Sequence, residues 1–179
     1  GISPRVFRAP DDTDTDSVFN YIDTASDRVG IGELTAKLES EVISVIGTGG
    51  TGGYIIDLLA KTPVREIRLF DADEFLQHNA FRAPGAPSLE QLREAPKKVD
   101  YFKGIYSKMH RGIVVHPIKL DQTNVDLLNG STFAFICMDA GDNKRVVVQK
   151  LEALGVSLID VGMGLELVNG SLGGILRVT

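Results

Sequence analysis

Cysteine is almost absent from this chain of 179 residues, which holds a single one, Cys137. A disulfide framework and an intrachain zinc site built from several cysteines are therefore excluded. This usage suits a reducing compartment, and we expect a cytoplasmic protein. No apolar run is long enough to span a bilayer, and the first residues do not form a charged and then apolar signal, so we expect no membrane partner.

The chain also lacks an excess of positive charge, because its formal net charge is −5 at pH 7. Since a general nucleic-acid footprint requires a basic surface, we expect no nucleic-acid partner. Hydrophobic residues make up 43% of the chain, enough to bury a core. The 19 glycines, several of them clustered, favour tight turns and close backbone approach.

Two regions differ in composition. Residues 1–40 read as a polar, acidic linker followed by an interrupted helical segment, and residues 41–179 alternate apolar runs with helical patterns. The alternation predicts an α/β fold with a Rossmann-like open, mostly parallel sheet and helices on both faces. We expect the second region to continue past the last residue, because residues 176–179 still read as a strand.

The expected elements follow from periodicity and breakers. Residues 74–96 are expected to be loop, because three prolines punctuate them. The apolar run at 133–138 is typical of a central parallel strand. Strands are expected at 43–46, 67–70, 113–118, 133–138 and 157–161, and helices at 54–61, 98–109, 124–128 and 143–154.

A glycine-rich loop follows the first expected strand and opens a helix. Gly47, Gly49 and Gly52 form the pattern G-x-G-x-x-G, and Gly50 adds a further glycine. Missing side chains let backbone N–H groups approach a phosphate, and the helix N-terminus adds partial positive charge. A tight turn without a ligand is the alternative, but the position between strand and helix favours a nucleotide. A P-loop is excluded, because no Lys-Ser/Thr pair follows Gly52.

Acidic residues follow two of the expected strands. Asp71 and Asp73 end the second strand, and Asp71 is favoured for the ribose because of its spacing from the glycine loop. A solvated turn acid or a helix cap is the alternative. Asp139 closes the apolar run, where a carboxylate can hold Mg²⁺ beside substrate phosphates. The alternative role for Asp139 is a cap of the next helix.

Amide and cationic side chains come after the ribose acids. Asn79 and Arg82 lie in the expected loop, and Lys97 and Lys98 begin the next helix. Each alone reads as an ordinary exposed residue. Together they extend beyond the ribose acid, where further phosphates would lie, which favours a triphosphate over a dinucleotide. Cys137 lies inside the apolar run and is interpreted as packing material.

In this order the residues resemble the ubiquitin-activating enzyme superfamily, and within it the ThiF/MoeB/HesA-like adenylyltransferases. The family pattern is G-x-G-G-x-G, then D-x-D, then N-x-x-R, then a Lys that opens a helix and an Asp that closes a later strand. The resemblance covers about residues 41–179 and implies an ATP-binding adenylation domain there. The matching positions are 47–52, 71–73, 79–82, Lys98 and Asp139.

The resemblance also implies chemistry and partners. A carboxylate would attack the α-phosphate of ATP, giving an acyl adenylate and pyrophosphate, with Mg²⁺ held by Asp139 and with Arg82 and Lys98 exposed toward the phosphates as the other catalytic residues. The acyl substrate would be a ubiquitin-like protein or a peptide with a C-terminal carboxylate, and the assembly a homodimer. The implied nucleotide-binding residues are Gly47, Gly49, Gly50, Gly52, Asp71, Asp73, Asn79, Arg82, and Lys98 with Lys97 as its rival.

The chain departs from this pattern after Asp139. The family usually follows its magnesium Asp directly with Asn, whereas residues 140–142 intervene here before Asn143, and Arg145 comes one place late. Arg28 matches poorly the Arg that family members bring in from a partner subunit. The family's Cys-x-x-Cys zinc site and a thioester cysteine are absent from the 179 residues, and we expect either to lie beyond them if present.

Two other functions remain open. An NAD-dependent oxidoreductase would explain the glycine loop and Asp71, but it gives no reason for the cations that follow. A catalytically degenerate adenylation fold, acting as a dimer partner or scaffold, would fit the altered spacing after Asp139.

Overall fold

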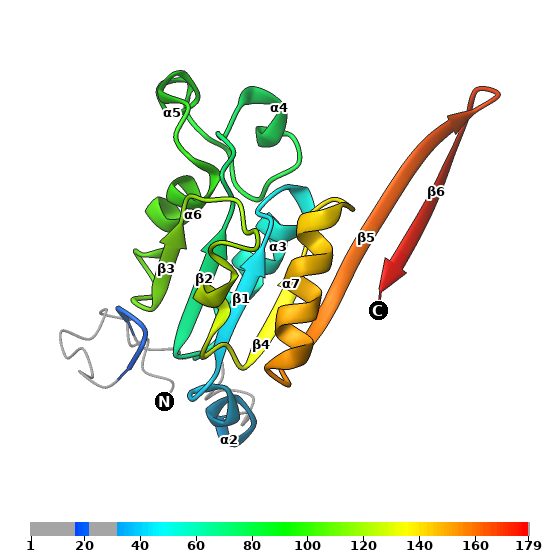
Figure 1. Cartoon of the computed structure of the whole chain (residues 1–179). Coiled ribbons are helices and arrows are strands. Elements are labelled where there is room, and N and C mark those ends of the chain that lie inside the picture. Colours follow the sequence, from blue (N-terminus) through cyan, green and yellow to red (C-terminus); the bar gives the residue numbers. More distant parts are fainter. Residues whose placement is uncertain (1–16, 22–31, 179) are drawn as a thin grey trace, which may run out of the picture.

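Six strands form one sheet in the order β3-β2-β1-β4-β5-β6 (Figure 1). The first five are parallel, and β6 pairs antiparallel with β5. The computed structural model describes residues 17–21 and 32–178 of the chain. The expected α/β, Rossmann-like fold is confirmed. The strands are β1 (Val42–Ile46), β2 (Glu66–Phe70), β3 (Ile113–His116), β4 (Phe133–Ile136), β5 (Ser157–Val168) and β6 (Ser171–Val178).

Helices connect the strands and cover both faces of the sheet (Figure 1). None of the helices in the described residues is long and apolar enough to cross a bilayer. The α-helices are α2 (Gly32–Thr35), α3 (Gly50–Leu59), α4 (Gln77–Ala80), α5 (Leu89–Glu94), α6 (Lys98–Tyr106) and α7 (Asp142–Ala153), and the 3-10 helices are η1 (Ala36–Leu38) and η2 (Val125–Leu128).

Neighbouring residues of β1 supply two separate apolar cores. Val45 packs in one cluster with Ile56 of α3 and Phe102 of α6, and Ile46 packs in the other with Val147 of α7. Because successive side chains of a strand point to opposite faces, α3 and α6 cover one face of the sheet and α7 covers the other. All five residues of β1 are buried, as the central position of this parallel strand requires.

The expectation that residues 74–96 form only loop was wrong, because two short helices lie there. In α4 the side-chain oxygen of Asn79 accepts a hydrogen bond from the Leu76 backbone N–H at 2.9 Å. Before α5, Ser88 Oγ accepts from the Gln91 N–H at 3.2 Å, and Gln91 Oε1 accepts from the Ser88 N–H at 2.9 Å. This is a capping box, a signal visible in the sequence. The prolines flank the helices and do not interrupt them.

Most of the expected boundaries differ from the observed ones by one to three residues; for example, β3 ends at His116, β4 at Ile136 and α6 at Tyr106. Two boundaries differ by more. Helix α3 begins at Gly50, inside the glycine loop, and not at Tyr54. Strand β5 does not stop at Val161 but runs on to Val168 and turns through residues 169–170 into β6. Asn169 and Gly170 both have positive φ, as an Asn-Gly hairpin turn requires, and this hairpin projects from the body of the domain (Figure 1).

The described part of the N-terminal segment, residues 17–21, lies against the end of α6. The Arg111 backbone N–H donates to Val18 O at 2.8 Å, and the Asn20 N–H donates to Met109 O at 2.8 Å. The ring of Phe19 meets the imidazole of His110 edge to face, with centroids 5.7 Å apart. The remainder of the expected linker and Arg28 lie outside the described residues, so the division near residue 40 stays a prediction.

His110 is fully buried beneath this segment and has a defined tautomer. The Gly112 backbone N–H donates to His110 Nδ1 at 3.0 Å, so Nε2 carries the proton and donates to Val64 O at 2.9 Å. Protonation would place a second hydrogen on Nδ1, facing the Gly112 N–H. The neutral ring therefore fits this site and the charged ring does not.

We expect the free energy of unfolding to fall as the pH drops below about 6.5, the usual pKa of histidine. Burial lowers the pKa of His110, although hydrogen bonds to backbone carbonyls oppose this effect. The unfolded chain therefore binds a proton more readily than the folded one. The stabilisation from neutral His110 is complete above the unfolded pKa and is lost as the pH falls through the folded pKa.

Urea denaturation of the wild type and of His110→Gln, from about pH 8 to about pH 5, checks this expectation. The variant should show a shallower loss of stability on acidification. Burial also lowers the pKa of His116, which acts in the same direction in both proteins, so the difference between them isolates His110. Equal pH dependence in the two proteins would contradict the assignment.

Candidate functional site

The carboxyl ends of β1, β2 and β4 meet at one edge of the sheet, where a cavity of about 1660 Å³ opens. The strand order reverses at this point, since β1 leads to β2 on one side and pairs with β4 on the other. Ligands of open α/β sheets bind at such a reversal. The residues predicted from the sequence that line this cavity are Gly47, Gly49, Gly50, Asp71, Asp73, Asn79, Arg82, Lys98 and Asp139.

A side chain would have a different effect at each glycine of the loop. Gly47 has a φ of 91°, and a Cβ there would lie 2.7 Å from Cys137 O. A Cβ on Gly52 would lie 2.0 Å from Gly47 O, so Gly52 lets α3 start against the loop although it does not line the cavity. A Cβ on Gly49 would meet no atom within 4 Å. The open space at Gly49 faces the cavity, as expected where a ligand approaches the backbone.

Two alanine substitutions are expected to separate the structural glycine from the ligand-facing one. Gly52→Ala should lower the free energy of unfolding by about 3 kcal/mol, because its methyl group overlaps a backbone oxygen. Gly49→Ala should unfold like the wild type but bind nucleotide more weakly, because its methyl group enters the cavity. Urea denaturation and calorimetric titration with ATP measure the two effects. Wild-type nucleotide affinity in a folded Gly49→Ala protein would contradict this division of roles.

Asp71 is bonded to the glycine loop. Its Oδ2 accepts from the Thr48 backbone N–H at 2.8 Å and from Thr48 Oγ1 at 2.9 Å, and its Oδ1 accepts from the Asp73 N–H at 2.9 Å. The Asp71 side chain is 10% exposed and that of Asp73 is 71% exposed. Asp71 thus holds the loop in shape, and Asp73 presents the more accessible carboxylate to the cavity.

Lys98 lies in the cavity and is almost buried, so the expectation of an exposed side chain at the helix start was wrong. Its side chain is 11% exposed, and its Nζ lies 2.7 Å from Asp73 Oδ2 and 4.0 Å from Asp71 Oδ2. The hydrogen bond from Lys98 is the main cause of a lowered pKa of Asp73. The two carboxylates and the ammonium therefore form one charged group at the end of β2.

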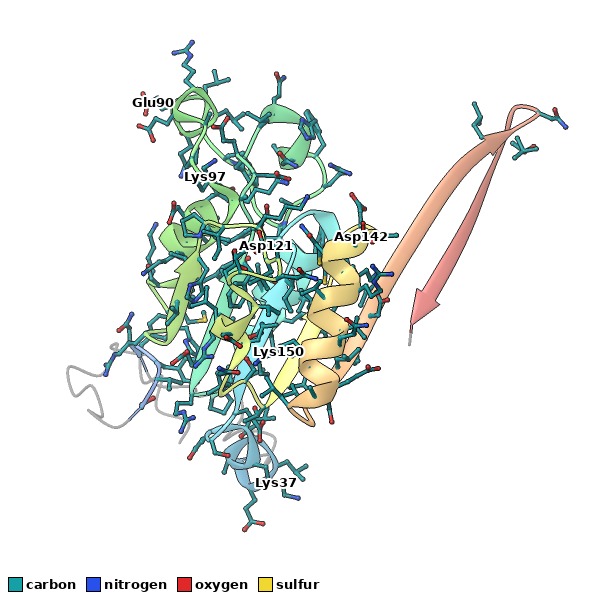
Figure 2. The ribbon with its side chains drawn as sticks, viewed as in Figure 1. Lys37, Glu90, Lys97, Asp121, Asp142 and Lys150 are labelled. Carbon is teal, nitrogen blue, oxygen red and sulfur yellow. The ribbon has the colours of Figure 1, made fainter. Side chains whose placement is uncertain are left out.

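Lys97 lies outside the cavity. Its Nζ donates to Ala72 O at 2.8 Å and lies 3.9 Å from Glu74 Oε1 (Figure 2). The structure therefore brings Lys98, and not its neighbour, next to the other predicted site residues.

Asn79 and Arg82 differ in how they are held. Asn79 is buried, and its amide oxygen is used to cap α4. The guanidinium of Arg82 is exposed and makes no hydrogen bond or ion pair with any residue in the described ranges. Arg82 is thus available to an anionic ligand, and Asn79 shapes the short helix that precedes it.

Two exposed carboxylates lie where β4 leads into α7. Asp139 lies in the connection, and Asp142 begins α7, with its carboxylate 3.1 Å from the Arg145 guanidinium (Figure 2). Both line the cavity. Asp142 is not among the residues predicted from the sequence, yet it directly precedes Asn143, which is the Asp-Asn order of the family pattern. It is a second candidate for a metal-binding carboxylate.

The described residues contain no cluster of three or more His, Cys, Asp or Glu that could hold a metal by themselves. Mg²⁺ is usually bound by one or two carboxylates together with substrate phosphates. The pair formed by Asp139 and Asp142 at the cavity edge fits a Mg²⁺ ion that arrives with a nucleotide.

Beneath these residues, Cys137 and an unassigned ion pair line the floor of the cavity. Burial, with a smaller effect of the Asp160 charge, raises the pKa of Cys137 to about 11. The thiol is protonated at neutral pH and is no nucleophile, in agreement with its interpretation as packing. Lys144 Nζ donates to Asp160 Oδ1 at 2.7 Å. Neither residue is among the site residues predicted from the sequence.

The fold and the cavity define a nucleotide-binding α/β domain, and comparison with known proteins identifies the family. A model of the ThiF family matches residues 24–170. The chain therefore belongs to the ThiF family.

Similar proteins and structures agree with this assignment. The adenylyltransferase and sulfurtransferase UBA4 of Saccharomyces cerevisiae is 25% identical over 134 residues, which cover 73% of this chain and 30% of that protein. The chain thus spans less than a third of the length of this relative. The fold is similar to that of Escherichia coli tRNA N6-threonylcarbamoyladenosine dehydratase TcdA in complex with ATP, with a TM-score of 0.64, 17% identity, and coverage of 79% of this chain and 63% of that one. It is also similar to Escherichia coli MccB with MccA, with a TM-score of 0.63, 18% identity, and coverage of 81% and 42%.

Proposed function

We propose that this domain activates a carboxylate with ATP, forming an acyl adenylate and releasing pyrophosphate. The observation that carries the proposal is the single cavity that gathers the glycine loop, the Asp73–Lys98 pair, Arg82 and Asp139 at the reversal of the strand order. Membership of the ThiF family and the likeness to an adenylyltransferase support it.

Each part of the cavity suits one part of ATP. The open backbone at Gly49 and the N-terminus of α3 suit the phosphates, because they offer N–H groups and partial positive charge. Asp73 suits the ribose hydroxyls, and we assign it this contact ahead of Asp71, whose oxygens are bonded to the loop and to the Asp73 N–H. Lys98 and Arg82 suit the negative charge of the triphosphate.

Asp139 and Asp142 would hold Mg²⁺ when ATP is bound. The metal would neutralise charge on the phosphates as pyrophosphate leaves. The chain itself would supply Lys98 and Arg82 as fixed cations and would hold the two reactants close together.

No protein nucleophile is needed for this reaction. An oxygen of the substrate carboxylate attacks the α-phosphorus, and the bond from that phosphorus to the pyrophosphate oxygen breaks. Cys137 lines the cavity, but its raised pKa keeps the thiol protonated, so it takes no covalent part. The catalytic contribution of the chain is positioning and charge stabilisation.

We propose a ubiquitin-like protein or a peptide with a C-terminal carboxylate as the acyl substrate. The resemblance of the site residues to the ubiquitin-activating enzyme superfamily supports this class of substrate. TcdA is named as an enzyme of tRNA, but the net charge of −5 on this chain argues against a nucleic-acid partner. A homodimer in the cytoplasm, without a membrane partner, completes the proposal.

Calorimetry with ATP and Mg²⁺, matched by a titration with NAD, tests the nucleotide. We expect binding of ATP and none of NAD, because Lys98 and Arg82 extend the charged surface beyond the ribose acids. Binding of NAD without binding of ATP would favour the oxidoreductase and contradict the proposal.

Exchange of labelled pyrophosphate into ATP tests the reaction. Peptides that end in a free carboxylate should support exchange, and the same peptides with an amidated C-terminus should not. ATP binding without exchange for any free carboxylate would identify a degenerate domain with a scaffold role.

A further inference from the structure

The ion pair between Lys144 and Asp160 connects three elements at the floor of the cavity. Lys144 lies in the first turn of α7, and Asp160 lies on β5, paired in register with Ile136 of β4. The two side chains are 17% and 8% exposed, and their N–O distance is 2.7 Å. Lys144 Nζ also lies 3.5 Å from Met138 O, two residues past the end of β4. The ammonium thus connects the start of α7 to β5 and to the segment that follows β4.

Such a pair contributes little to stability by itself. Removing two charges from water costs about as much as their attraction returns, so a largely buried pair is weak support for a fold. Removing one partner is costly, because the other charge is then left in a poorly solvated place. The effect of the pair is therefore to favour one geometry over others.

The segment that this geometry fixes is the connection from β4 to α7. Asp139, Ala140, Gly141 and Asp142 are all exposed, and the described contacts give Asp142 only the exposed pair with Arg145. Exposed ion pairs hold a loop weakly. The Lys144 side chain reaches the carbonyl of Met138 just before this segment, and the Arg145 backbone N–H donates to Gly141 O at 3.3 Å within it.

We propose that Lys144 and Asp160 position residues 139–143, the connection from β4 and the first two residues of α7, so that the carboxylates of Asp139 and Asp142 meet the metal and phosphates of ATP in a reactive arrangement. This inference rests on the proposed function and adds to it a pair of positioning residues. Neither residue is assigned a contact with the reacting atoms. Lys144 is already bonded to a carboxylate, and the charges of the pair cancel near the phosphates.

The variants Lys144→Met and Asp160→Asn test this role, because each removes one charge and keeps most of the side-chain volume. We expect the maximal rate of pyrophosphate exchange to fall by about tenfold to a hundredfold, as for a small misplacement of reacting groups. The ATP dissociation constant should change by less than about threefold. The Mg²⁺ concentration for half-maximal exchange should rise. Lys144→Arg, which keeps the charge, should lose less than Lys144→Met.

The double variant Lys144→Met/Asp160→Asn should be no slower than the slower single variant, because both single changes break the same interaction. Hydrogen exchange of the ligand-free protein should be faster at residues 139–143 in each variant. This measurement is independent of the reaction, so a wild type that does not exchange pyrophosphate would overturn the proposed function and leave the positioning role to be judged by hydrogen exchange.

Lys150→Met is the matched control. Lys150 forms an ion pair of 2.6 Å with Asp126 near the other end of α7, away from the cavity (Figure 2). Its loss should leave both the exchange rate and the protection of residues 139–143 unchanged. The inference is overturned if Lys144→Met behaves like Lys150→Met. It is also overturned if ATP affinity falls by the same factor as the rate, because Lys144 would then bind phosphate directly.

Discussion

Lys98→Met and Arg82→Ala should each abolish measurable adenylate formation while the domain remains folded. Lys98 presents its ammonium to the cavity from the start of α6, and Arg82 presents a guanidinium that no described residue occupies. Loss of one charge-assisted contact to a phosphate costs about 1.5–3 kcal/mol. ATP affinity should fall by about tenfold or more, and the rate should fall further if the contact tightens as the phosphates separate.

Methionine is chosen at position 98 because the lysine stem is almost buried, and alanine would also leave a gap. Lys97→Met is the control, since its ammonium is bonded outside the cavity. It should exchange pyrophosphate at close to the wild-type rate. The proposed triphosphate site is wrong if Lys97→Met is inactive while Lys98→Met is active. It is also wrong if both Lys98→Met and Arg82→Ala retain full activity.

Asp139→Asn should lose catalysis far more than nucleotide binding. The variant keeps the shape of the side chain and one oxygen but removes the charge that favours Mg²⁺. ATP would still be held at the glycine loop, Asp73 and Arg82, so its affinity should change by only about threefold, whereas the rate should fall by more than about a hundredfold.

Asp142→Asn decides between the two carboxylates of the β4–α7 connection. If Asp139 is the metal-binding residue, as we propose, Asp142→Asn should be the milder of the two changes. If Asp142→Asn is inactive and Asp139→Asn is fully active, Asp142 is the metal-binding residue. Cys137→Ser is the control for disturbance of the strand below, and a folded but inactive Cys137→Ser would overturn its interpretation as packing.

The parts of the fold that local chemistry determines could be predicted from the sequence. The apolar runs that became β1, β2 and β4 lie at the centre of the sheet, where β1 is buried throughout and the other two are buried in part. The glycine pattern after β1 follows from the close approach of Gly52 to Gly47. A parallel sheet then brings the residues after each strand to one edge. For this reason, residues far apart in the chain could be expected to share a site.

Features that depend on tertiary contacts could not be predicted in the same way. Asp71 and Asp73 are chemically identical and two residues apart, and only the hydrogen bonds from Thr48 show that Asp71 is used to hold the loop. The burial of Lys98 follows from how the start of α6 meets the segment after β2, where the Lys98 backbone N–H donates to Asp73 O at 2.9 Å, and no periodicity reveals this contact. The capping box of α5 is a local signal that the sequence does contain. The prolines on either side of it favoured a prediction of loop instead.

The ion pair between Lys98 and Asp73 also bears on which ligands the cavity selects. The carboxylate that we assign to the ribose is bonded to the ammonium that we assign to the phosphates. A nucleoside without phosphate would have to compete for Asp73 and would leave Lys98 with only the carboxylate of Asp71, 4.0 Å away. A triphosphate would replace the carboxylate at Lys98 and free Asp73 for the sugar in the same event. If the two residues have the roles that we propose, the pair should favour ATP over adenosine, because adenosine offers no anion in exchange for the carboxylate.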